Sequence, residues 1–175
     1  MFGAPTPAGA TEVGDSRNFG LGLGLGTATS LVGKYFIDRE SALDFGVSFF
    51  RYRRGCWQDR RGVRYCDGYG DSYRNGSFGL HLDYLWQDML VRRTAKLDWH
   101  IGAGARFWHW DYDDYYYTYY DDSRSALAAR MPIGLDLTFV RPDFLEIYLE
   151  AAPSLYFVPF VALDVEAFIG ARFYF

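Results

Sequence analysis

The sequence predicts an all-β protein, a closed eight-stranded antiparallel transmembrane β-barrel. Apolar and polar residues alternate with a period of two along most of the 175 residues, and helical periodicity is nearly absent. The apolar side of each alternating segment is nearly free of charge, whereas the opposite side mixes glycine with Asp, Glu, His and Arg. Aromatic residues make up 20% of the chain, and its only lysines are Lys34 and Lys96. A barrel whose apolar face meets lipid accounts for all three observations.

Four of the predicted strands lie in the first half of the chain. Residues 19–26 alternate Phe or Leu with Gly, and a tight link leads into residues 31–37. Residues 41–50 set Leu, Phe and Val against Ala, Asp, Gly and Ser. Residues 78–87 set Phe, Leu, Tyr and Trp against Gly, His, Asp and Gln. Each segment therefore has one apolar and one polar face, as a strand between two environments requires.

The other four predicted strands continue this pattern to the last residue. Residues 97–107 and 126–139 keep Leu, Ile and Phe on one face and place Asp, Arg and Gly on the other. Residues 145–151 separate Leu and Ile from Glu and Tyr, and residues 161–175 alternate over fifteen positions. The predicted brief polar turns are 37–40, 88–96 and 141–144, and the predicted long connections are 51–76 and 111–124. Short turns at one end and long loops at the other are typical of transmembrane barrels.

A soluble sandwich or lipocalin-like barrel is the alternative architecture. It would turn the same apolar face inward and expose the charged face to water. The polar face here is rich in glycine and poor in lysine, which suits a narrow interior better than an open surface. No apolar run approaches the ~18 residues of a transmembrane helix. The net charge of −4 gives no indication of nucleic-acid binding.

The chain is predicted to hold one domain. Residues 1–17 lack the basic start and apolar stretch of a signal peptide, and we expect a flexible N-terminal segment there. Residues 18–175 form the single barrel domain. Cys56 and Cys66 are the only cysteines. Two thiols without a nearby histidine make a poor zinc site, so we expect a disulfide between them, and no metal or cofactor.

The end of the chain carries a family resemblance. Gly170, Phe173 and Phe175 form a Gly-x-x-Phe-x-Phe ending that resembles the assembly signal of bacterial outer-membrane barrels. Eight strands resemble the small OmpA, OmpX and OmpW type barrels. The resemblance implies the outer membrane of a Gram-negative bacterium and insertion by the barrel-assembly machinery. Residues 20–49 also resemble PopA-like barrels of predatory bacteria, which form rings that enclose lipid. That likeness implies a homo-oligomer that holds membrane lipid.

The polar faces of the strands are predicted to meet inside the barrel. Charges in a low-dielectric space must be paired, so we expect an interior salt-bridge network rather than a catalytic centre or a pore. Its predicted members are Lys34, Asp44, His81, Asp83, Asp98, His100, Arg106, Asp136, Glu146, Glu150, Asp164, Glu166 and Arg172, and Arg130 lies on the same face.

The long connection after residue 50 is rich in arginine. Its predicted site residues are Arg53, Arg54, Arg60, Arg61 and Arg64. These side chains either bind lipid phosphates, those of lipopolysaccharide included, or pair with the acidic loop at 111–122, in the same subunit or in a neighbour. We therefore expect a non-enzymatic barrel that organises lipid or presents loops. The alternatives are an outer-leaflet lipid-modifying enzyme and a soluble lipocalin-like binder.

Overall fold

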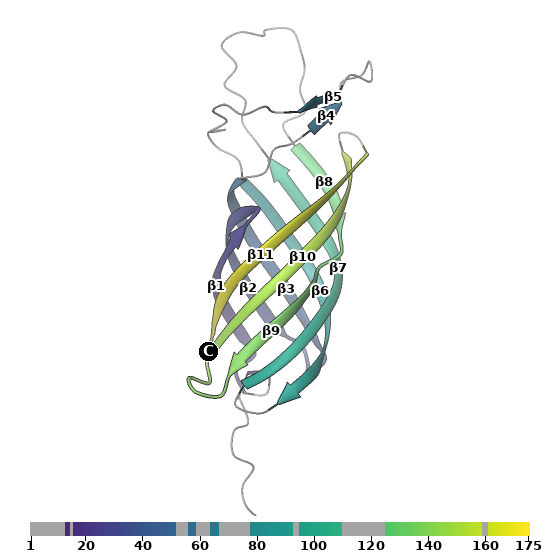
Figure 1. Ribbon diagram of the computed structural model, residues 1–175. Coiled ribbons are helices and arrows are strands. Elements are labelled where there is room, and N and C mark those ends of the chain that lie inside the picture. The colour runs from purple at the N-terminus through teal and green to yellow at the C-terminus, as the bar shows by residue number, and fades with distance from the viewer. Residues whose placement is uncertain are drawn as a thin grey trace, which may run out of the picture.

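The computed structural model is an all-β barrel (Figure 1). It describes residues 13–14, 16–51, 56–58, 64–66, 78–92, 95–109, 125–158 and 161–175. Within these residues, no helix is long and apolar enough to cross a membrane. The strands are β1 (Phe19–Gly26), β2 (Ala28–Phe36), β3 (Ser41–Arg51), β4 (Cys56–Gln58), β5 (Arg64–Cys66), β6 (Phe78–Arg92), β7 (Ala95–His109), β8 (Ser125–Arg130), β9 (Ile133–Phe139), β10 (Leu145–Val158) and β11 (Ala162–Tyr174).

Antiparallel pairing closes the sheet into a ring. β1, β2, β3, β6 and β7 pair in this order, β10 pairs with β11, and β11 pairs with β1. Both β8 and β9 pair with β7 on one side and with β10 on the other, so they share one position in the ring. The ring therefore has eight strand positions, and the predicted closed eight-stranded fold is confirmed.

The predicted single strand at 126–139 is divided at Met131 and Pro132. Proline has no N–H, so it cannot continue the ladder of hydrogen bonds. The neighbouring backbone still finds partners, because Met131 N–H donates to the carbonyl of Pro153 (2.9 Å) and Gly102 N–H donates to that of Pro132 (2.8 Å). The break leaves the ring closed.

The predicted turn at 88–96 is largely wrong. β6 continues to Arg92 and β7 begins at Ala95. The pairing shifts register between Met89 and Val91, and three consecutive apolar residues, Met89, Leu90 and Val91, are exposed there. A bulge adds a residue and breaks the alternation. The period-two pattern therefore stops before the strand does.

The barrel has a short-turn end, at residues 37–40 and 140–144, and a long-loop end opposite. A cluster of apolar side chains closes the interior near each of these two ends. The cluster at the short-turn end contains Val13, Phe36, Ala42, Leu85 and Tyr174. The cluster toward the long-loop end contains Ala28, Val32, Trp108, Ala126, Ala128, Tyr148, Tyr156 and Phe168. Charged side chains fill the space between them.

The described part of the N-terminal segment contacts the short-turn end. Val13 is 4% exposed, and Gly14, with a φ of +83°, donates its N–H to the carbonyl of Arg17 (3.0 Å). Arg17 forms an ion pair with Asp143 in the β9–β10 turn (3.0 Å). Residues 1–12 and 15 lie outside the described part of the chain, so the predicted flexibility of 1–17 stays a prediction.

The turn between β2 and β3 is fixed locally. Ile37 N–H donates to the carbonyl of Ser41 (3.0 Å), and Glu40 N–H donates to the Asp38 carboxylate (2.8 Å). The nearby Ser41 side chain and the hydrogen bond from this N–H hold the pKa of Asp38 below its ordinary value.

Candidate functional site: the filled interior and the apolar wall

Arg172 on β11 joins three acidic residues in the half of the interior nearer the short-turn end. Its guanidinium contacts Asp44 on β3 (2.6 Å), Glu146 on β10 (2.8 Å) and Asp136 on β9 (3.7 Å). Lys34 on β2 reaches Asp136 at 2.7 Å. Because these residues come from five strands, the ion pairs tie together strands that are not neighbours in the sheet.

Arg130 on β8 has the corresponding role nearer the long-loop end. It donates hydrogen bonds to Asp83 on β6 and to Glu150 on β10, and its Nε lies 3.9 Å from Glu166 on β11. His100 on β7 connects the two halves. Its Nδ1 lies 2.8 Å from Asp136 and its Nε2 lies 3.5 Å from Glu150.

Arg106 on β7 links these ion pairs to the apolar cluster toward the long-loop end, which contains Trp108. It donates to the Nδ1 of His81 (3.0 Å) and to the Ser48 hydroxyl (3.0 Å), and it approaches Glu166 at 3.4 Å. Its guanidinium also stacks over the Trp108 ring, 4.6 Å from the ring centroid. A cation between a carboxylate and an aromatic face is stabilised from both sides.

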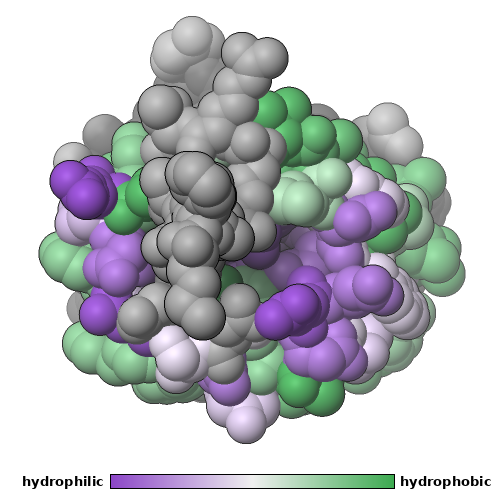
Figure 2. Space-filling view, turned by 90° about the horizontal axis from the view of Figure 1, so that it is seen from below, coloured by the Kyte–Doolittle hydropathy of each residue, from purple (hydrophilic) through white to green (hydrophobic). Residues whose placement is uncertain are grey.

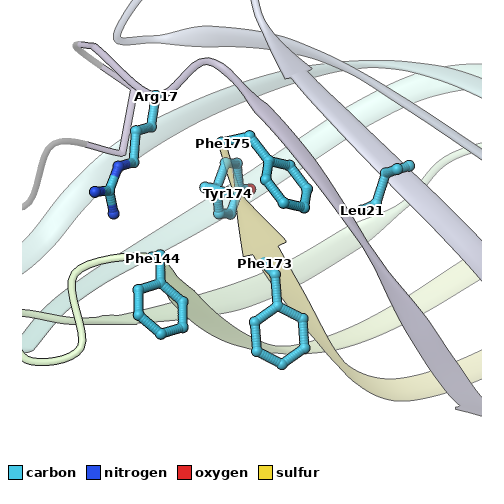
Figure 3. Close-up of a pocket in the computed structure, with 6 residues that line it drawn as sticks. All are labelled: Arg17, Leu21, Phe144, Phe173, Tyr174 and Phe175. Atoms are coloured by element: carbon cyan, nitrogen blue, oxygen red, sulfur yellow. The ribbon is translucent and has the colours of Figure 1, made fainter.

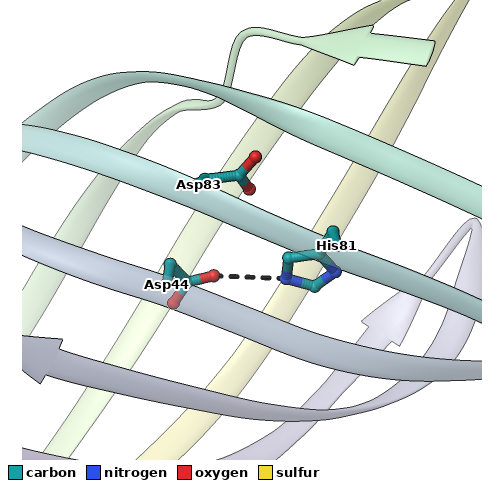
Figure 4. A group of neighbouring side chains, drawn as sticks. All are labelled: Asp44, His81 and Asp83. Carbon is teal, nitrogen blue, oxygen red and sulfur yellow. Dashed lines mark hydrogen bonds and ion pairs between the residues drawn. The ribbon is translucent and has the colours of Figure 1, made fainter.

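Asp44, His81 and Asp83 bring potential metal ligands within 4.8 Å of one another (Figure 4). The cluster does not fit a divalent cation, however. Asp44 is paired with Arg172, Asp83 with Arg130, and the Nδ1 of His81 accepts from Arg106. A bound metal would face three fixed positive charges at its own ligands. The arrangement suits ion pairing instead.

The structure places eleven predicted network residues in these contacts: Lys34, Asp44, His81, Asp83, His100, Arg106, Asp136, Glu146, Glu150, Glu166 and Arg172. Asp98 contacts Lys96 (2.8 Å) at the short-turn end. Asp164 is half-buried, and its carboxylate accepts a hydrogen bond from the N–H of Val165 (2.9 Å).

Aromatic rings fill the space that glycines leave on the inner face. The Tyr148 side chain lies over Gly24 and Gly170, where an added Cβ would collide with it. Trp108 covers Gly79, and Tyr174 covers Gly20, in the same way. The alternation marked these glycines as inward-facing but could not tell which ring covers each. Gly170 therefore packs against Tyr148, which is a structural reason for a glycine here that is independent of any assembly signal. The other two residues of the predicted signal, Phe173 and Phe175, are 47% and 71% exposed.

The loop predictions fall mostly outside the described residues. Arg53, Arg54, Arg60 and Arg61 are not described, and Arg64 is described only by its backbone position in β5, opposite Gln58. Cys56 and Cys66 are direct partners across the β4–β5 hairpin. Direct antiparallel partners lie within the Cα separation that a disulfide spans. Their side chains lie outside the described part, so the bond stays a prediction.

The outer wall is apolar and exposed. Seen from the short-turn end, hydrophobic residues gather along the perimeter, and hydrophilic residues surround the centre (Figure 2). Exposed wall residues include Leu23, Leu31, Leu80, Leu82, Leu135, Leu149, Leu163 and Ile169. So large a continuous apolar surface needs a non-aqueous or protein partner. With a charged interior, it is the inverse of a soluble barrel.

Two contributors to the site, Val13 and Tyr148, are not predicted by the sequence pattern. Val13 closes the short-turn end, although the N-terminal segment showed no alternation that could have indicated a buried side chain. Tyr148 was placed only on a polar face, whereas it lies between two glycines beneath Arg172, whose guanidinium is 3.9 Å from the ring centroid.

Comparison with known proteins supports this architecture. No family model matches the chain, and neither does any curated protein. Among solved structures, the N-terminal β-barrel domain of Pseudomonas aeruginosa OprF matches with a TM-score of 0.51 and 12% identity, over 90% of this chain and 96% of that one. Ail, the attachment invasion locus protein of Yersinia pestis, matches with a TM-score of 0.36 and 11% identity, over 90% and 94%. The OprF match shows that the chain has the fold of the small outer-membrane barrels, as its resemblance to that class predicted.

Proposed function

We propose that this protein is a non-enzymatic integral barrel in the outer membrane of a Gram-negative bacterium. Its outer wall and its loops carry the function, by organising lipid and contacting partners. In the finer form of the proposal, several copies associate side by side and hold membrane lipid between them. The barrel-assembly machinery inserts each copy, with Phe173 and Phe175 as part of its signal.

The filled interior carries this proposal. A charged network lies between two apolar clusters, and the cavity beside Asp44, His81 and Arg130 measures about 10 Å³. That volume is room for about one water molecule. An interior of this kind offers neither a conduction path nor a substrate site in the described residues. The parts of the barrel that remain to carry a function are its outer wall and its loops.

The outer wall offers a place for two copies to meet. Ala151 on β10 and Ala167 on β11 are direct partners, and both are exposed. In lipid, association gains little from the hydrophobic effect and depends on close packing, which small side chains permit. The arginine-rich loop then contacts lipid phosphates or the acidic loop of a neighbour.

Native mass spectrometry from mild detergent tests this proposal. We expect several subunits with retained lipid, and no steady current when the protein is placed in a planar bilayer. Ala151→Trp should lower the subunit number because it fills the contact wall, whereas Ala103→Trp, exposed on β7, should not. A lipid-poor monomer in several mild detergents would overturn the assembly. Stable currents of porin size would overturn the filled interior.

One contact supports a second candidate, an enzyme acting on outer-leaflet lipid. The Ser125 hydroxyl lies 3.1 Å from the Nδ1 of His109, near the long-loop end. A hydroxyl beside an imidazole is the minimal pair for nucleophilic catalysis. Both residues alternate with inward Trp108 and Ala126, so they face outward. Hydrolysis of purified lipid A that Ser125→Ala abolishes would favour this candidate. Equal, background-level turnover by both proteins would remove it.

A further inference from the structure

A groove opens on the outer wall where β11 meets β1 and the β9–β10 turn. It has a volume of about 620 Å³ and is lined by Arg17, Leu21, Phe144, Phe173, Tyr174 and Phe175 (Figure 3). The rings of Phe144 and Phe173 stack at a centroid distance of 6.1 Å. Leu21, Phe144 and Phe173 are each between 40% and 47% exposed, so the groove offers an apolar floor open to the membrane.

Backbone hydrogen bonds hold the walls of the groove in place. Tyr174 N–H donates to the carbonyl of Phe144 (2.8 Å), and Phe175 N–H donates to that of Phe19 (2.9 Å). The β9–β10 turn is thereby tied to β11, and the end of β11 is tied to β1. The groove is a fixed feature of the barrel seam rather than a gap between independent segments.

A pair of opposite charges stands at the rim of the groove. Arg17 and Asp143 contact each other at 3.0 Å, and their side chains are 30% and 37% exposed. Arg17 is also held from behind, because Val13 is buried in the barrel mouth and Gly14 bonds back to the Arg17 carbonyl. A cation and an anion are thus both within reach of the same bound molecule.

We propose that the groove binds one phosphatidylethanolamine molecule, with its headgroup at Arg17 and Asp143 and an acyl chain along Leu21, Phe144 and Phe173. This inference rests on the proposed membrane location. The phosphate oxygens accept hydrogen bonds from Arg17, and the primary ammonium donates to Asp143. The headgroup and the rim therefore match charge for charge.

Other phospholipid headgroups fit the rim less well. Phosphatidylglycerol supplies a phosphate for Arg17, but it brings a net negative charge toward Asp143 and has no cation to offer. Phosphatidylcholine carries a quaternary ammonium, which has no N–H to donate to a carboxylate. The charge pair therefore selects a lipid with a primary ammonium.

Competition among lipids tests the site. The barrel is reconstituted in nanodiscs that contain equal amounts of the three lipids, then released gently and examined by native mass spectrometry. We expect phosphatidylethanolamine to be retained several-fold over the other two. Asp143→Asn should remove its advantage over phosphatidylglycerol, and Arg17→Gln should lower the retention of both. Arg39→Gln, a matched change in the exposed β2–β3 turn, should leave the preference intact.

The outcomes separate this inference from the proposal beneath it. Equal retention of all three lipids, or a preference for phosphatidylglycerol, by a correctly inserted barrel would overturn the groove assignment alone. Failure of the refolded wild-type protein to enter nanodiscs would overturn the membrane location itself. Heat-modifiable migration of each variant in gels confirms that the substitution left the barrel folded.

Discussion

The two faces of each strand obey opposite rules in this barrel. On β11, Arg172 is 0% exposed while the next residue, Phe173, is 47% exposed. On β9, Asp136 is 1% exposed beside Leu135 at 41%. The inner face is stabilised by matching charge to charge, and in the proposed membrane location the outer face is stabilised by matching apolar surface to lipid. A charged side chain should therefore stabilise the barrel on the inner face and destabilise it on the outer face, even at neighbouring residues.

The inner face also has to balance its total charge. Among the described residues, seven buried carboxylates face four buried Lys or Arg side chains. The carboxylates are Asp44, Asp83, Asp98, Asp136, Glu146, Glu150 and Glu166, and the cations are Lys34, Arg106, Arg130 and Arg172. Lys96 adds a fifth cation beside Asp98. The histidines are the remaining groups that can supply positive charge.

Removing a central cation should have the largest effect. Arg172→Met leaves Asp44 and Glu146 without their main partner, and an unpaired buried charge costs about 3–5 kcal/mol. We expect the free energy of unfolding in detergent, measured by urea titration, to fall by that amount. Arg39→Met, in an exposed turn, is the control and should change little. Equal unfolding midpoints for the two variants would mean that the inner pairs contribute no stability.

Placing a charge on the outer face should have the next largest effect. Leu135→Arg moves a guanidinium into the exposed wall, at a cost of about 2–4 kcal/mol if the position lies near the bilayer midplane. Leu127→Arg, near the long-loop end, should cost only ~0–1 kcal/mol because the charge reaches the interface. Unfolding in lipid vesicles measures both. Equal costs for the two substitutions would contradict a position of Leu135 nearer the bilayer midplane than that of Leu127.

Alternation predicted the face of most strand residues but not their partners. Leu135 and Arg172 stand on the faces that the period of two assigned to them. Lys34, however, meets Asp136, which lies 102 residues away along the chain. Such a contact depends on the register and stagger of several strands, and neither can be derived from one strand's pattern.

The departures from the predicted elements have local causes. Pro132 keeps the alternation of apolar and polar residues but lacks an N–H. The break between β8 and β9 therefore cannot be recognised from the period-two pattern. The bulge at Met89 to Val91 did the reverse, because it ended the alternation inside β6. Val13 belongs to the same buried apolar cluster as Phe36 and Tyr174, which are distant residues that no local pattern connects to it.

The two interior histidines should respond differently to the same substitution. His100 faces a carboxylate with each ring nitrogen, as an imidazolium does, whereas the Nδ1 of His81 accepts from Arg106. Gln can imitate a neutral imidazole that donates once and accepts once, but it cannot supply a charge. We expect His100→Gln to lower the free energy of unfolding by about 1.5–3 kcal/mol and His81→Gln by clearly less. The reverse order would show that His100 does not act as a cation in the interior.

The smallest expected effect is that of removing the Tyr148 hydroxyl, and its sign is informative when it is compared with the same change at Tyr174. Tyr174 donates to Glu146 at 3.0 Å, whereas the buried hydroxyl of Tyr148 has no hydrogen-bond partner among the described residues. Both rings pack against glycines, so Phe preserves the packing in each case. Tyr174→Phe should cost about 1.5–3 kcal/mol, because a bond to a charged acceptor is lost. Tyr148→Phe should leave the stability unchanged or raise it by up to about 1 kcal/mol, because only a desolvated hydroxyl is removed. Urea titration of the pair in one detergent decides the matter. A loss at Tyr148 equal to that at Tyr174 would mean that its hydroxyl is bonded in the folded barrel, and that the inner face satisfies even its least connected polar group.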